Sequence, residues 1–349
     1  MTPLRLAIIG SGGIAKIHAA AMDLLPEVRL VAVCARSTDK AAELAQPRSA
    51  QIFRTLEDLL AMDGLDGVLV ATPSGVHAEA VIPALRSGRH VLCEKPLEIT
   101  MERIQRILAE AEKSGCLLAG FFPLRCGEGA QAIKQAADSG RFGKLTFLSA
   151  RVKWWRNQDY YRLSSWRGRW DMDGGGALMN QGIHAVDLLQ WIGGLPARVA
   201  AFADNLTHPG IEVEDTLAAA LQFPGGAMGT IEAATSCHPG LDLSLEVSGD
   251  KGTAVLVNDR LVDWRFSEEL PEDTAIREGR SGGRIRGGSA DPLAISCEGH
   301  RQQIQAFCQA IRGEAGGIIP GHEAARSVAV VEAIYRSIRS KNFEPVSMP

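Results

Sequence analysis

In the first 120 residues, short apolar and β-branched runs alternate with amphipathic segments of helical period. This alternation predicts a parallel, doubly wound α/β sheet, because each strand of such a sheet is followed by a helix that returns the chain to the same edge. The predicted strands cover residues 4–9, 28–34, 51–53, 67–71, 89–93 and 116–120. The helices are predicted to begin near Gly12, Thr38, Thr55, Gly75 and Thr100, and the three threonines are the predicted N-caps.

After Phe121-Phe122-Pro123 the pattern changes to longer segments in which apolar and polar residues alternate. This pattern predicts an α+β domain with an open, mostly antiparallel sheet. Its predicted strands cover residues 144–155, 196–206, 214–223, 227–235, 242–249 and 252–258, with helices near 175–192, 299–312 and 321–339. The glycine-rich stretch 265–297 is predicted to be a mobile excursion, and its role stays open. We therefore expect two domains, residues 1–122 and 123–349.

Composition excludes several classes of protein. The net charge of −4 and the lack of a basic run argue against nucleic acid or an anionic membrane as a partner. No apolar stretch approaches the roughly 20 residues of a spanning helix, and no signal-peptide pattern is present, so we expect a cytoplasmic protein. The seven cysteines are odd in number and lack C-x-x-C spacing, which argues against a disulfide framework or a metal site. We expect reduced, mostly buried thiols.

A glycine-rich turn follows the first apolar run. The segment Gly10-Ser11-Gly12-Gly13-Ile14-Ala15 comes directly after Leu6-Ala7-Ile8-Ile9, which predicts strand, tight turn and helix. In that context the spacing indicates a dinucleotide site, because glycine lets the backbone approach a pyrophosphate that the N–H groups of the helix N-terminus then bind. The predicted cofactor contacts in this turn are Gly10, Gly12, Gly13 and Ile14.

Two further strand ends carry candidate residues. Glu94-Lys95-Pro96 follows the apolar run Val91-Leu92-Cys93, which places an acid, an amine and a rigid turn where open α/β sheets hold ligands. We expect Glu94 and Lys95 to border the cofactor. Thr72-Pro73-Ser74 follows the fourth strand and is expected to lie along the dinucleotide. His77, in the next helix, is either a cofactor contact or a packing and capping histidine.

The end of the second strand bears on the choice of cofactor. NAD-preferring sites of this type present an acidic residue to the ribose 2′-OH, whereas this strand continues as Cys34-Ala35-Arg36-Ser37-Thr38-Asp39-Lys40. Arg36 could pair with a 2′-phosphate, with Ser37 and Lys40 beside it and Ala35 lining the turn. We therefore predict a preference for NADP(H) over NAD(H). The alternative is that Arg36 only covers the adenine and tolerates either cofactor.

The chain resembles the Gfo/Idh/MocA family from end to end. Three segments carry this resemblance: the glycine-rich turn Gly10–Ala15, Glu94-Lys95-Pro96, and the run Gly174-Gly175-Gly176-Ala177-Leu178-Met179-Asn180-Gln181-Gly182-Ile183-His184-Ala185-Val186-Asp187. The resemblance implies a pyridine-nucleotide oxidoreductase acting on sugars, cyclitols or related polyols. It also implies a Rossmann domain followed by an open sheet that often forms the oligomer interface, so we expect a homodimer or a homotetramer.

The resemblance assigns roles to five residues. Hydride removal from a secondary alcohol requires a base for the proton and stabilisation of charge on oxygen, which the Lys95 ammonium and His184 can provide. Glu94 is expected to orient Lys95. Asn180 stands where many family members have aspartate, so it can position a hydroxyl but cannot accept a proton. The version Asn-Gln-Gly-Ile-His resembles members that act on sugar nucleotides or modified sugars. The spacing i, i+4, i+7 puts Asn180, His184 and Asp187 on one helix face, so Asp187 is either catalytic or a buttress for His184.

Aromatic residues and arginines gather between residues 154 and 170, ahead of this helix. Stacking faces beside guanidinium groups suit a sugar ring and a phosphate or carboxylate, while the same composition is typical of a subunit interface. The substrate-binding candidates here are Trp155, Arg156, Tyr160 and Arg167, joined by Asn180, His184 and, from family position, Arg125.

Two other functions fit the motifs. One is a nicotinamide-dependent glycosidase, in which a hydride leaves and returns to the same sugar so that no net oxidation occurs. The other is a non-catalytic sensor of dinucleotide and sugar. The presence of Lys95 and His184 argues against the sensor, while accumulation of reduced cofactor would separate the dehydrogenase from the glycosidase.

Overall fold

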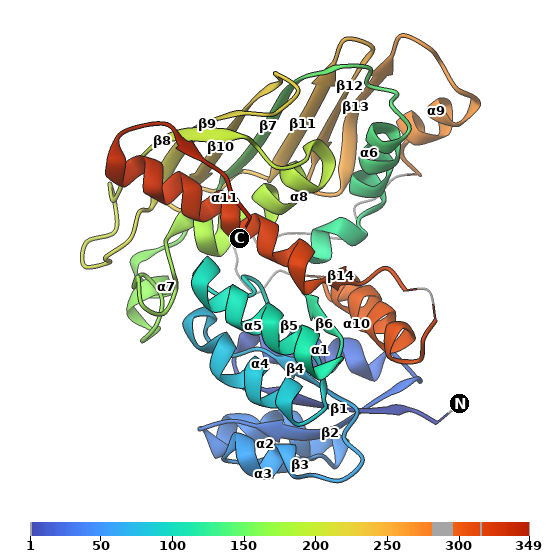
Figure 1. The fold of residues 1–349 in the computed structure, drawn as a ribbon, viewed down its shortest axis with the longest axis vertical. Helices are drawn as coiled ribbons and strands as arrows, with labels where there is room; N and C mark the ends of the chain where they lie inside the picture. Colours follow the sequence, from blue (N-terminus) through green and yellow to red (C-terminus); the bar gives the residue numbers. More distant parts are fainter. Residues whose placement is uncertain (1, 281–295, 315, 349) are drawn as a thin grey trace. The chain divides into compact units, whose positions relative to one another are not determined.

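A computed structural model describes residues 2–280, 296–314 and 316–348. The chain forms two compact units (Figure 1): unit 1 contains Met1–Pro123 and Cys297–Ala325, and unit 2 contains Leu124–Ser296 and Arg326–Pro349. The predicted second domain, 123–349, therefore needs correction at 297–325. This segment packs with unit 1 because Ile304, Phe307 and Cys308 complete its hydrophobic core.

Unit 1 is built on a seven-stranded sheet with strand order β14-β6-β5-β4-β1-β2-β3. The strands are β1 Leu4–Ile9, β2 Val28–Cys34, β3 Gln51–Phe53, β4 Gly67–Val70, β5 His90–Cys93, β6 Leu118–Gly120 and β14 Ile319–Pro320. All pairs are parallel except β14 with β6. This confirms the predicted doubly wound sheet, to which β14 adds a short edge strand.

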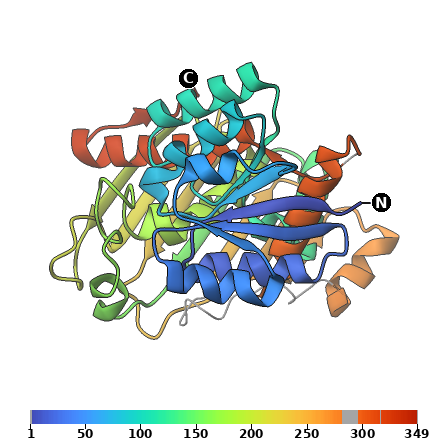
Figure 2. The same cartoon turned by 90° about the horizontal axis from the view of Figure 1, so that it is seen from below.

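Helices lie on both faces of this sheet (Figure 2). They are α1 Gly13–Asp23, α2 Thr38–Ala45, α3 Leu56–Leu60, α4 His77–Arg86, α5 Met101–Ser114 and α10 Glu298–Ile311, and α11 Gly321–Ser340 starts here and continues into unit 2. Thr55 and Thr100 cap α3 and α5 as predicted. The prediction for Thr38 is wrong: Ser37 caps α2, because its backbone is extended and its Oγ accepts the Lys40 N–H at 3.4 Å.

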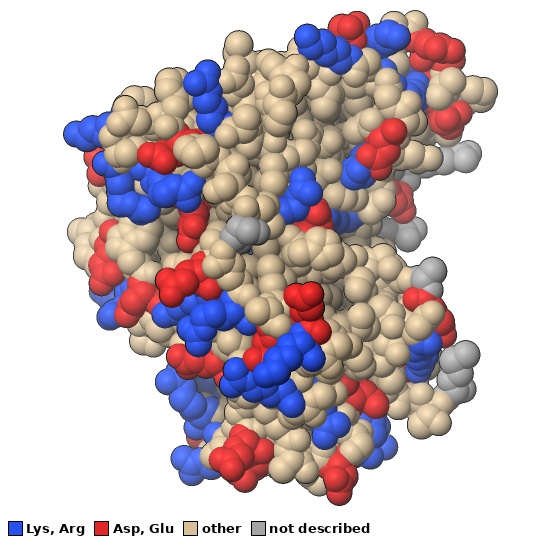
Figure 3. Space-filling model, in the orientation of Figure 1, with Lys and Arg blue, Asp and Glu red and all other residues tan. Residues whose placement is uncertain are grey.

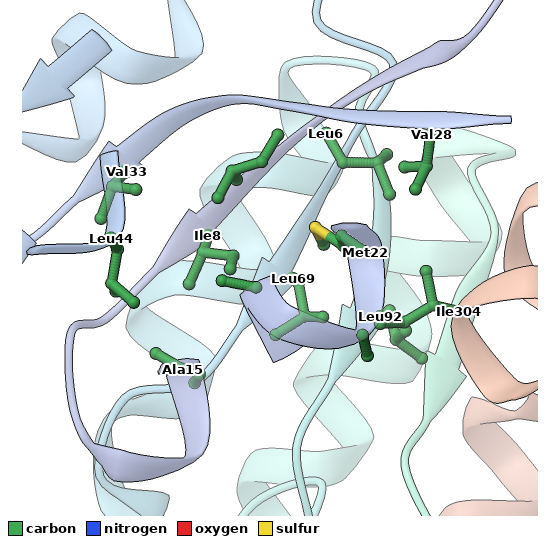
Figure 4. Packing of buried hydrophobic residues seen from close by; sticks show 14 of the residues in the cluster. Leu6, Ile8, Ala15, Met22, Val28, Val33, Leu44, Leu69, Leu92 and Ile304 are labelled. Carbon is green, nitrogen blue, oxygen red and sulfur yellow. The ribbon is translucent and has the colours of Figure 1, made fainter. Parts of the chain in front are cut away.

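The core of unit 1 joins strands and helices that are distant in sequence. Leu6, Ile8 and Leu69 from the central strands pack with Met22 of α1 and Ile304 of α10 (Figure 4). Each such fully buried side chain contributes about 1.5–3 kcal/mol of transfer free energy. These contacts fix the strand ends that carry the candidate residues.

Unit 2 contains an eight-stranded sheet with strand order β13-β12-β11-β7-β10-β9-β8-β15. The strands are β7 Leu145–Lys153, β8 Arg198–Asp204, β9 Thr216–Gln222, β10 Met228–Ala234, β11 Ser244–Gly249, β12 Gly252–Val257, β13 Arg260–Phe266 and β15 Glu344–Pro345. Every pair is antiparallel except β10 with β7. The predicted open, mostly antiparallel sheet is confirmed, and β13 and β15 are additional strands.

Helices of unit 2 precede, interrupt and follow the strands of its sheet. They include α6 Glu128–Asp138, α7 Gln158–Arg162, the π-helical segment Ala177–Gly182, α8 Ile183–Gly193 and α9 Pro271–Ala275. Helices α6 and α8 pack on one face of the sheet. The predicted excursion 265–297 is wrong at its start, where the end of β13, α9 and a π-helical turn at Ile276–Arg280 are regular structure. Residues 281–295 of that stretch lie outside the described residues.

The cysteines, the charged surface side chains and the helices bear on the expectations drawn from composition. All seven cysteines are free thiols, but only Cys34, Cys93 and Cys308 are buried, so "mostly buried" is wrong for the other four. Basic and acidic side chains are interspersed over the face shown in Figure 3, with no patch of one sign. Within the part of the chain that the structure describes, no helix has both the length and the apolar character needed to cross a bilayer.

Candidate active site

The glycine turn of unit 1 has the geometry that a bound pyrophosphate requires. Gly10 adopts φ +121°, and a Cβ there would lie 2.4 Å from the Ala71 carbonyl oxygen, so only glycine fits between the ends of β1 and β4. Gly12 is the N-cap of α1 and offers no side-chain cap, and a Cβ there would meet nothing within 4 Å. The N-terminus of α1 is thus open on that side and its first turn carries no acidic residue. These residues fit the phosphates of a dinucleotide.

The ends of β1, β4 and β5 lie along one edge of the sheet because these strands are parallel and adjacent. The strand order reverses between β1 and β4, which is the switch point where doubly wound sheets bind ligands. Thr72-Pro73-Ser74 follows β4 at this edge, and Glu94-Lys95 follows β5. The structure therefore brings the glycine turn and both predicted strand-end segments to one edge of unit 1.

His77 is a packing residue, so its predicted contact with the cofactor needs correction. Its side chain is 1% exposed, and its Nδ1 and Nε2 atoms lie 2.8 Å from the Pro96 carbonyl oxygen and 3.0 Å from the Thr72 carbonyl oxygen. Both ring nitrogens are therefore engaged by backbone. The ring links the segment after β4 to the segment after β5.

Glu94 is buried and holds the backbone of Lys95. Its Oε1 lies 2.7 Å from His18 Nε2 on α1, and its Oε2 accepts the Lys95 N–H at 3.0 Å. Burial raises the pKa of Glu94, but the hydrogen bond and charge of His18 outweigh it and lower the pKa to about 2. Each carboxylate oxygen can accept a second hydrogen bond, so the predicted contact of Glu94 with the cofactor stays a prediction. Glu94 binds the backbone N–H of Lys95, whose side chain is half-buried, and its predicted role of orienting the Lys95 amine stays a prediction.

Two histidines behind Glu94 were missed by sequence reasoning. The ring of His18 lies 4.7 Å from that of Phe121 and 5.0 Å from that of His300, centroid to centroid. The ligand atoms of His18, Glu94 and His300 lie within 4.8 Å of one another, a spacing that could hold a metal ion. The direct hydrogen bond between His18 and Glu94 accounts for the arrangement without one. A histidine in α1 carried no signal of its own, since its partners are distant in sequence.

The segment after β2 presents its side chains to solvent. Arg36, Ser37 and Lys40 are exposed and Ala35 is buried. Ser37 Oγ caps α2 by accepting the Lys40 N–H, and its hydroxyl hydrogen can still be donated to a ligand.

In unit 2, Asn180 and His184 do not share a regular α-helical face as predicted. Asn180 lies in the π-helical segment and His184 in the first turn of α8, so the assumed period of 3.6 residues does not apply between them. Asn180 Nδ2 donates to Asp173 Oδ1 at 2.7 Å, and Asp173 Oδ2 accepts the Gly168 N–H at 3.0 Å. Both Asn180 and His184 are half-buried.

Arg125 and Asp187 form a buried ion pair, which bears on the predicted roles of both. Arg125 Nε and Nη2 each donate to Asp187 at 2.7 Å, and Ser327 Oγ donates to the same carboxylate at 2.9 Å. Asp187 is 1% exposed, and burial raises its pKa while Arg125 opposes the rise. This pairing argues against Asp187 in catalysis and Arg125 on substrate, and it fits the alternative in which Asp187 is a structural residue.

The arginines and aromatic residues ahead of α8 form a cluster around Tyr160. The guanidinium carbon of Arg167 lies 4.0 Å from the ring centroid and that of Arg156 lies 5.4 Å from it. Gln181, which sequence reasoning missed, donates from Nε2 to the Tyr160 hydroxyl at 2.9 Å. Burial lowers the pKa of Arg156. Trp155 instead packs edge-on against His238, with 5.2 Å between ring centroids.

The sequence resembles known proteins over most of its length. Residues 4–122 match the model "Oxidoreductase family, NAD-binding Rossmann fold", and residues 130–255 match "GFO/IDH/MocA C-terminal domain". The chain is 24% identical to Myo-inositol 2-dehydrogenase of Thermotoga maritima, with 97% of each chain covered. It is 29% identical to D-glucoside 3-dehydrogenase of Escherichia coli, over 73% of this chain and 77% of that one.

Among solved structures, the WlbA dehydrogenase of Bordetella pertussis in complex with NADH and UDP-GlcNAcA is 32% identical, with a TM-score of 0.91 over 100% of this chain and 99% of that one. The WlbA dehydrogenase of Chromobacterium violaceum, with the same two ligands, is 28% identical, with a TM-score of 0.91 over 100% and 97% of the two chains.

Proposed function

The chain belongs to the Gfo/Idh/MocA family of nicotinamide-dependent oxidoreductases, and from this premise we propose that it transfers a hydride between the cofactor and a secondary alcohol or ketone of a sugar, sugar derivative or cyclitol. The observation that carries the proposal is the position of Lys95. It lies at the same sheet edge as the glycine turn, and the buried carboxylate of Glu94 holds its backbone. A bound nicotinamide supplies the hydride acceptor or donor.

Lys95 and His184 supply the acid–base chemistry. The Lys95 ammonium stabilises negative charge that develops on the substrate oxygen, while the His184 imidazole takes the hydroxyl proton on oxidation and returns it on reduction. Asn180, whose amide is oriented by Asp173, positions a substrate hydroxyl. Its amide does not exchange a proton at neutral pH.

The substrate carries an anionic group. Support comes from Arg156 and Arg167, which place two guanidinium groups near one phenol ring next to Gln181. Two like charges held close together are stabilised by a carboxylate or phosphate between or beside them. The Bordetella pertussis WlbA structure contains UDP-GlcNAcA. We accordingly place this chain's substrate among sugar acids and sugar nucleotides.

The choice between NADP(H) and NAD(H) depends on the segment after β2. The absence of an acidic residue at the end of β2 and the exposure of Arg36 and Lys40 favour NADP(H), as predicted from the sequence. The NADH in both WlbA structures weighs against that preference. Arg36 is the residue that decides, since its guanidinium can pair with a 2′-phosphate or lie over the adenine.

The open face of the unit 2 sheet is proposed to join subunits in a homodimer or homotetramer. Phe202 of β8 and Met228 of β10 are 87% and 59% exposed, and apolar groups exposed on a sheet face mark an interaction surface. Sedimentation velocity tests this: a monomer across the micromolar range would contradict it.

A cytoplasmic location stays a prediction from the sequence.

The activity is tested with purified protein, each nicotinamide cofactor and a panel of neutral sugars, sugar acids, cyclitols and sugar nucleotides. Reduced nicotinamide should accumulate in proportion to oxidised product, with an anionic substrate preferred. Product release without reduced cofactor would identify a redox-assisted glycosidase instead. Binding of cofactor and sugar without turnover of any member would identify a sensor.

A further inference from the structure

Glu214 binds the start of the segment that carries Asn180 and His184. This residue lies in the loop between β8 and β9 and is 6% exposed. Its Oε2 accepts the Gly176 N–H at 3.0 Å, its Oε1 accepts the Leu178 N–H at 2.9 Å, and its backbone oxygen accepts the Ala177 N–H at 3.0 Å. One residue thus binds three consecutive N–H groups.

Glu214 and Tyr335 approach the backbone of Gly175 and Gly176 so closely that only glycine fits at these two positions. A Cβ on Gly176 would lie 1.7 Å from the Glu214 backbone oxygen, and a Cβ on Gly175 would lie 2.1 Å from the hydroxyl of Tyr335 on α11. That hydroxyl donates to Glu214 Oε1 at 2.9 Å. The glycine run before the helix therefore serves the approach of Glu214 and Tyr335, a role that its sequence alone did not reveal.

The bound N–H groups are the first of a helical run. The π-helical segment begins at Ala177, the Asn180 N–H donates to the Gly176 carbonyl oxygen at 3.0 Å, and α8 continues directly with His184 in its first turn. N–H groups at a helix start have no partner within the helix, and their partial positive charge favours a carboxylate. Glu214 therefore sets where this run begins and how its first turns are oriented.

We propose that Glu214 is a positioning residue for catalysis. It holds Gly176–Leu178 so that Asn180 and His184, a few residues further on, are oriented to position the substrate hydroxyl and to transfer its proton. The proposal rests on the proposed function of those two residues. Glu214 acts through the backbone that they share and makes no contact with the reacting atoms.

The hydrogen bonding of the Glu214 carboxylate to the Gly176 and Leu178 N–H groups, which we call the clamp, is expected to depend on pH. Burial raises the pKa of Glu214 to about 7, against the lowering effect of the hydrogen bonds from Leu178, Tyr335 and Gly176. A neutral carboxyl is a weaker acceptor, and one of its oxygens carries the proton, so protonation weakens the hold on the two N–H groups.

A cavity of about 540 Å³ lies in unit 2, and Glu214 is one of the residues that line it. The other titratable or charged groups lining it come from each neighbouring element: Tyr335 and Arg339 from α11, Asp204 from β8 and Glu212 from the loop of Glu214 itself.

The test compares Glu214→Gln with Glu212→Gln. Gln keeps the shape of the side chain but replaces one acceptor oxygen by an NH₂ group, so one of the two N–H bonds is lost. Glu212 lines the same cavity, and its side chain accepts the Trp170 N–H at 3.1 Å. We expect Glu214→Gln to lower kcat/KM by roughly 10- to 100-fold, the cost of misplacing a catalytic group. The dissociation constant of the dinucleotide should not change, and Glu212→Gln should behave as wild type.

A second measurement does not depend on turnover. Hydrogen-exchange protection factors of the Gly176 and Leu178 amides should fall as the pH is lowered through about 7 in the wild type. In Glu214→Gln the amide that loses its acceptor should have a low protection factor that is independent of pH. In Tyr335→Phe the midpoint should move to higher pH, because the lost hydroxyl stabilised the carboxylate. This variant also tests the clamp if Glu214→Gln does not fold.

The outcomes separate this proposal from the proposed function. Protection factors that are the same in wild type and Glu214→Gln, or the same across pH in the wild type, would overturn the clamp. An unchanged kcat/KM in Glu214→Gln would overturn its role in catalysis while leaving Lys95 and His184 in place. If the protection factors of the Gly176 and Leu178 amides change as expected but the protein turns over no substrate, the result would support the clamp and refute the dehydrogenase.

Discussion

His184 is the residue whose role depends most on its protonation. A positioned acid or base contributes about 10²- to 10⁴-fold to rate, so His184→Asn should lower kcat by that range. It should also remove the part of the acidic limb of the pH profile that His184 causes. The measurement is kcat/KM across pH, with His322→Asn, a change on α11, as the control. A profile that keeps both height and shape would make His184 structural.

Arg36 decides between the two cofactors at the scale of one side chain. If it pairs with a 2′-phosphate, Arg36→Ala should lower kcat/KM with NADP(H) selectively, by roughly 1.5–3 kcal/mol of transition-state stabilisation, the value of a charged hydrogen bond. Equal losses with both cofactors would show that the guanidinium only covers the adenine. A wild-type preference for NAD(H) would contradict the prediction from the sequence and agree with the NADH in the WlbA structures.

Single residues were predictable where their neighbours in sequence fixed their place. Lys95 follows an apolar strand and precedes proline, so its position at the sheet edge followed from local pattern alone. The pairing of Arg125 with Asp187 was missed because they are 62 residues apart and only packing brings them together. His18 and Gln181 were missed for the same reason: each is recognisable only by a distant partner, Glu94 or Tyr160.

The buried pair of Arg125 and Asp187 joins the 3-10 turn Pro123–Cys126 to α8. Asp187→Asn should destabilise unit 2 by about 3–5 kcal/mol, because the guanidinium then stays buried without its carboxylate. Urea unfolding measures the difference. The matched control is Asp138→Asn at the end of α6, where a 63% exposed carboxylate pairs with Lys134; this change should cost under about 1 kcal/mol. Equal effects of the two substitutions would contradict the account.

Asp273 anchors α9 and gives the unit an acid-sensitive contact. Its carboxylate accepts hydrogen bonds from Arg141, the Trp264 indole and the Leu270 N–H, and the Arg141 bond leads the effects that lower its pKa to about 2. A lowered pKa stabilises the fold above the unfolded pKa near 4, and that stability is lost as the pH falls toward 2. The stability difference between wild type and Asp273→Asn should therefore shrink by about 2 kcal/mol from about pH 5 to about pH 2. A difference that is constant with pH would contradict this.

Regular elements were predictable from period and turn residues, and irregular ones were not. The strands of unit 1 match the prediction to within two residues because their apolar runs end at glycine, proline or capping residues. The segment 177–182 was predicted as ordinary helix, yet it is π-helical, and its first N–H groups bind Glu214, which is distant in sequence. β13 was missed because its last residues overlap in sequence with the glycine-rich stretch 265–297, in which no regular structure was expected.

At the scale of the whole molecule, the sequence predicted two sheets of different kinds but not which helices belong to each. The amphipathic pattern of residues 298–311 shows that this helix buries one face, yet nothing local specifies the sheet that it covers. In the structure Ile304 and Phe307 complete the core of unit 1, so the chain returns to its first unit after building the second. Such a return is decided by long-range packing.

The central claim is that Lys95 supports hydride transfer and does not hold the cofactor. The pyrophosphate should be bound by the backbone of Gly10–Ile14, so Lys95→Met should bind the dinucleotide within about an order of magnitude of wild type. Lys113→Met, an exposed change on α5, is the matched control.

The most direct measurement is single-turnover absorbance of the nicotinamide with saturating cofactor and an oxidisable anionic sugar. Wild type and Lys113→Met should form reduced nicotinamide in proportion to oxidised sugar, while Lys95→Met binds the cofactor and forms none. Formation of reduced nicotinamide by Lys95→Met at a rate near that of the wild type would contradict the account.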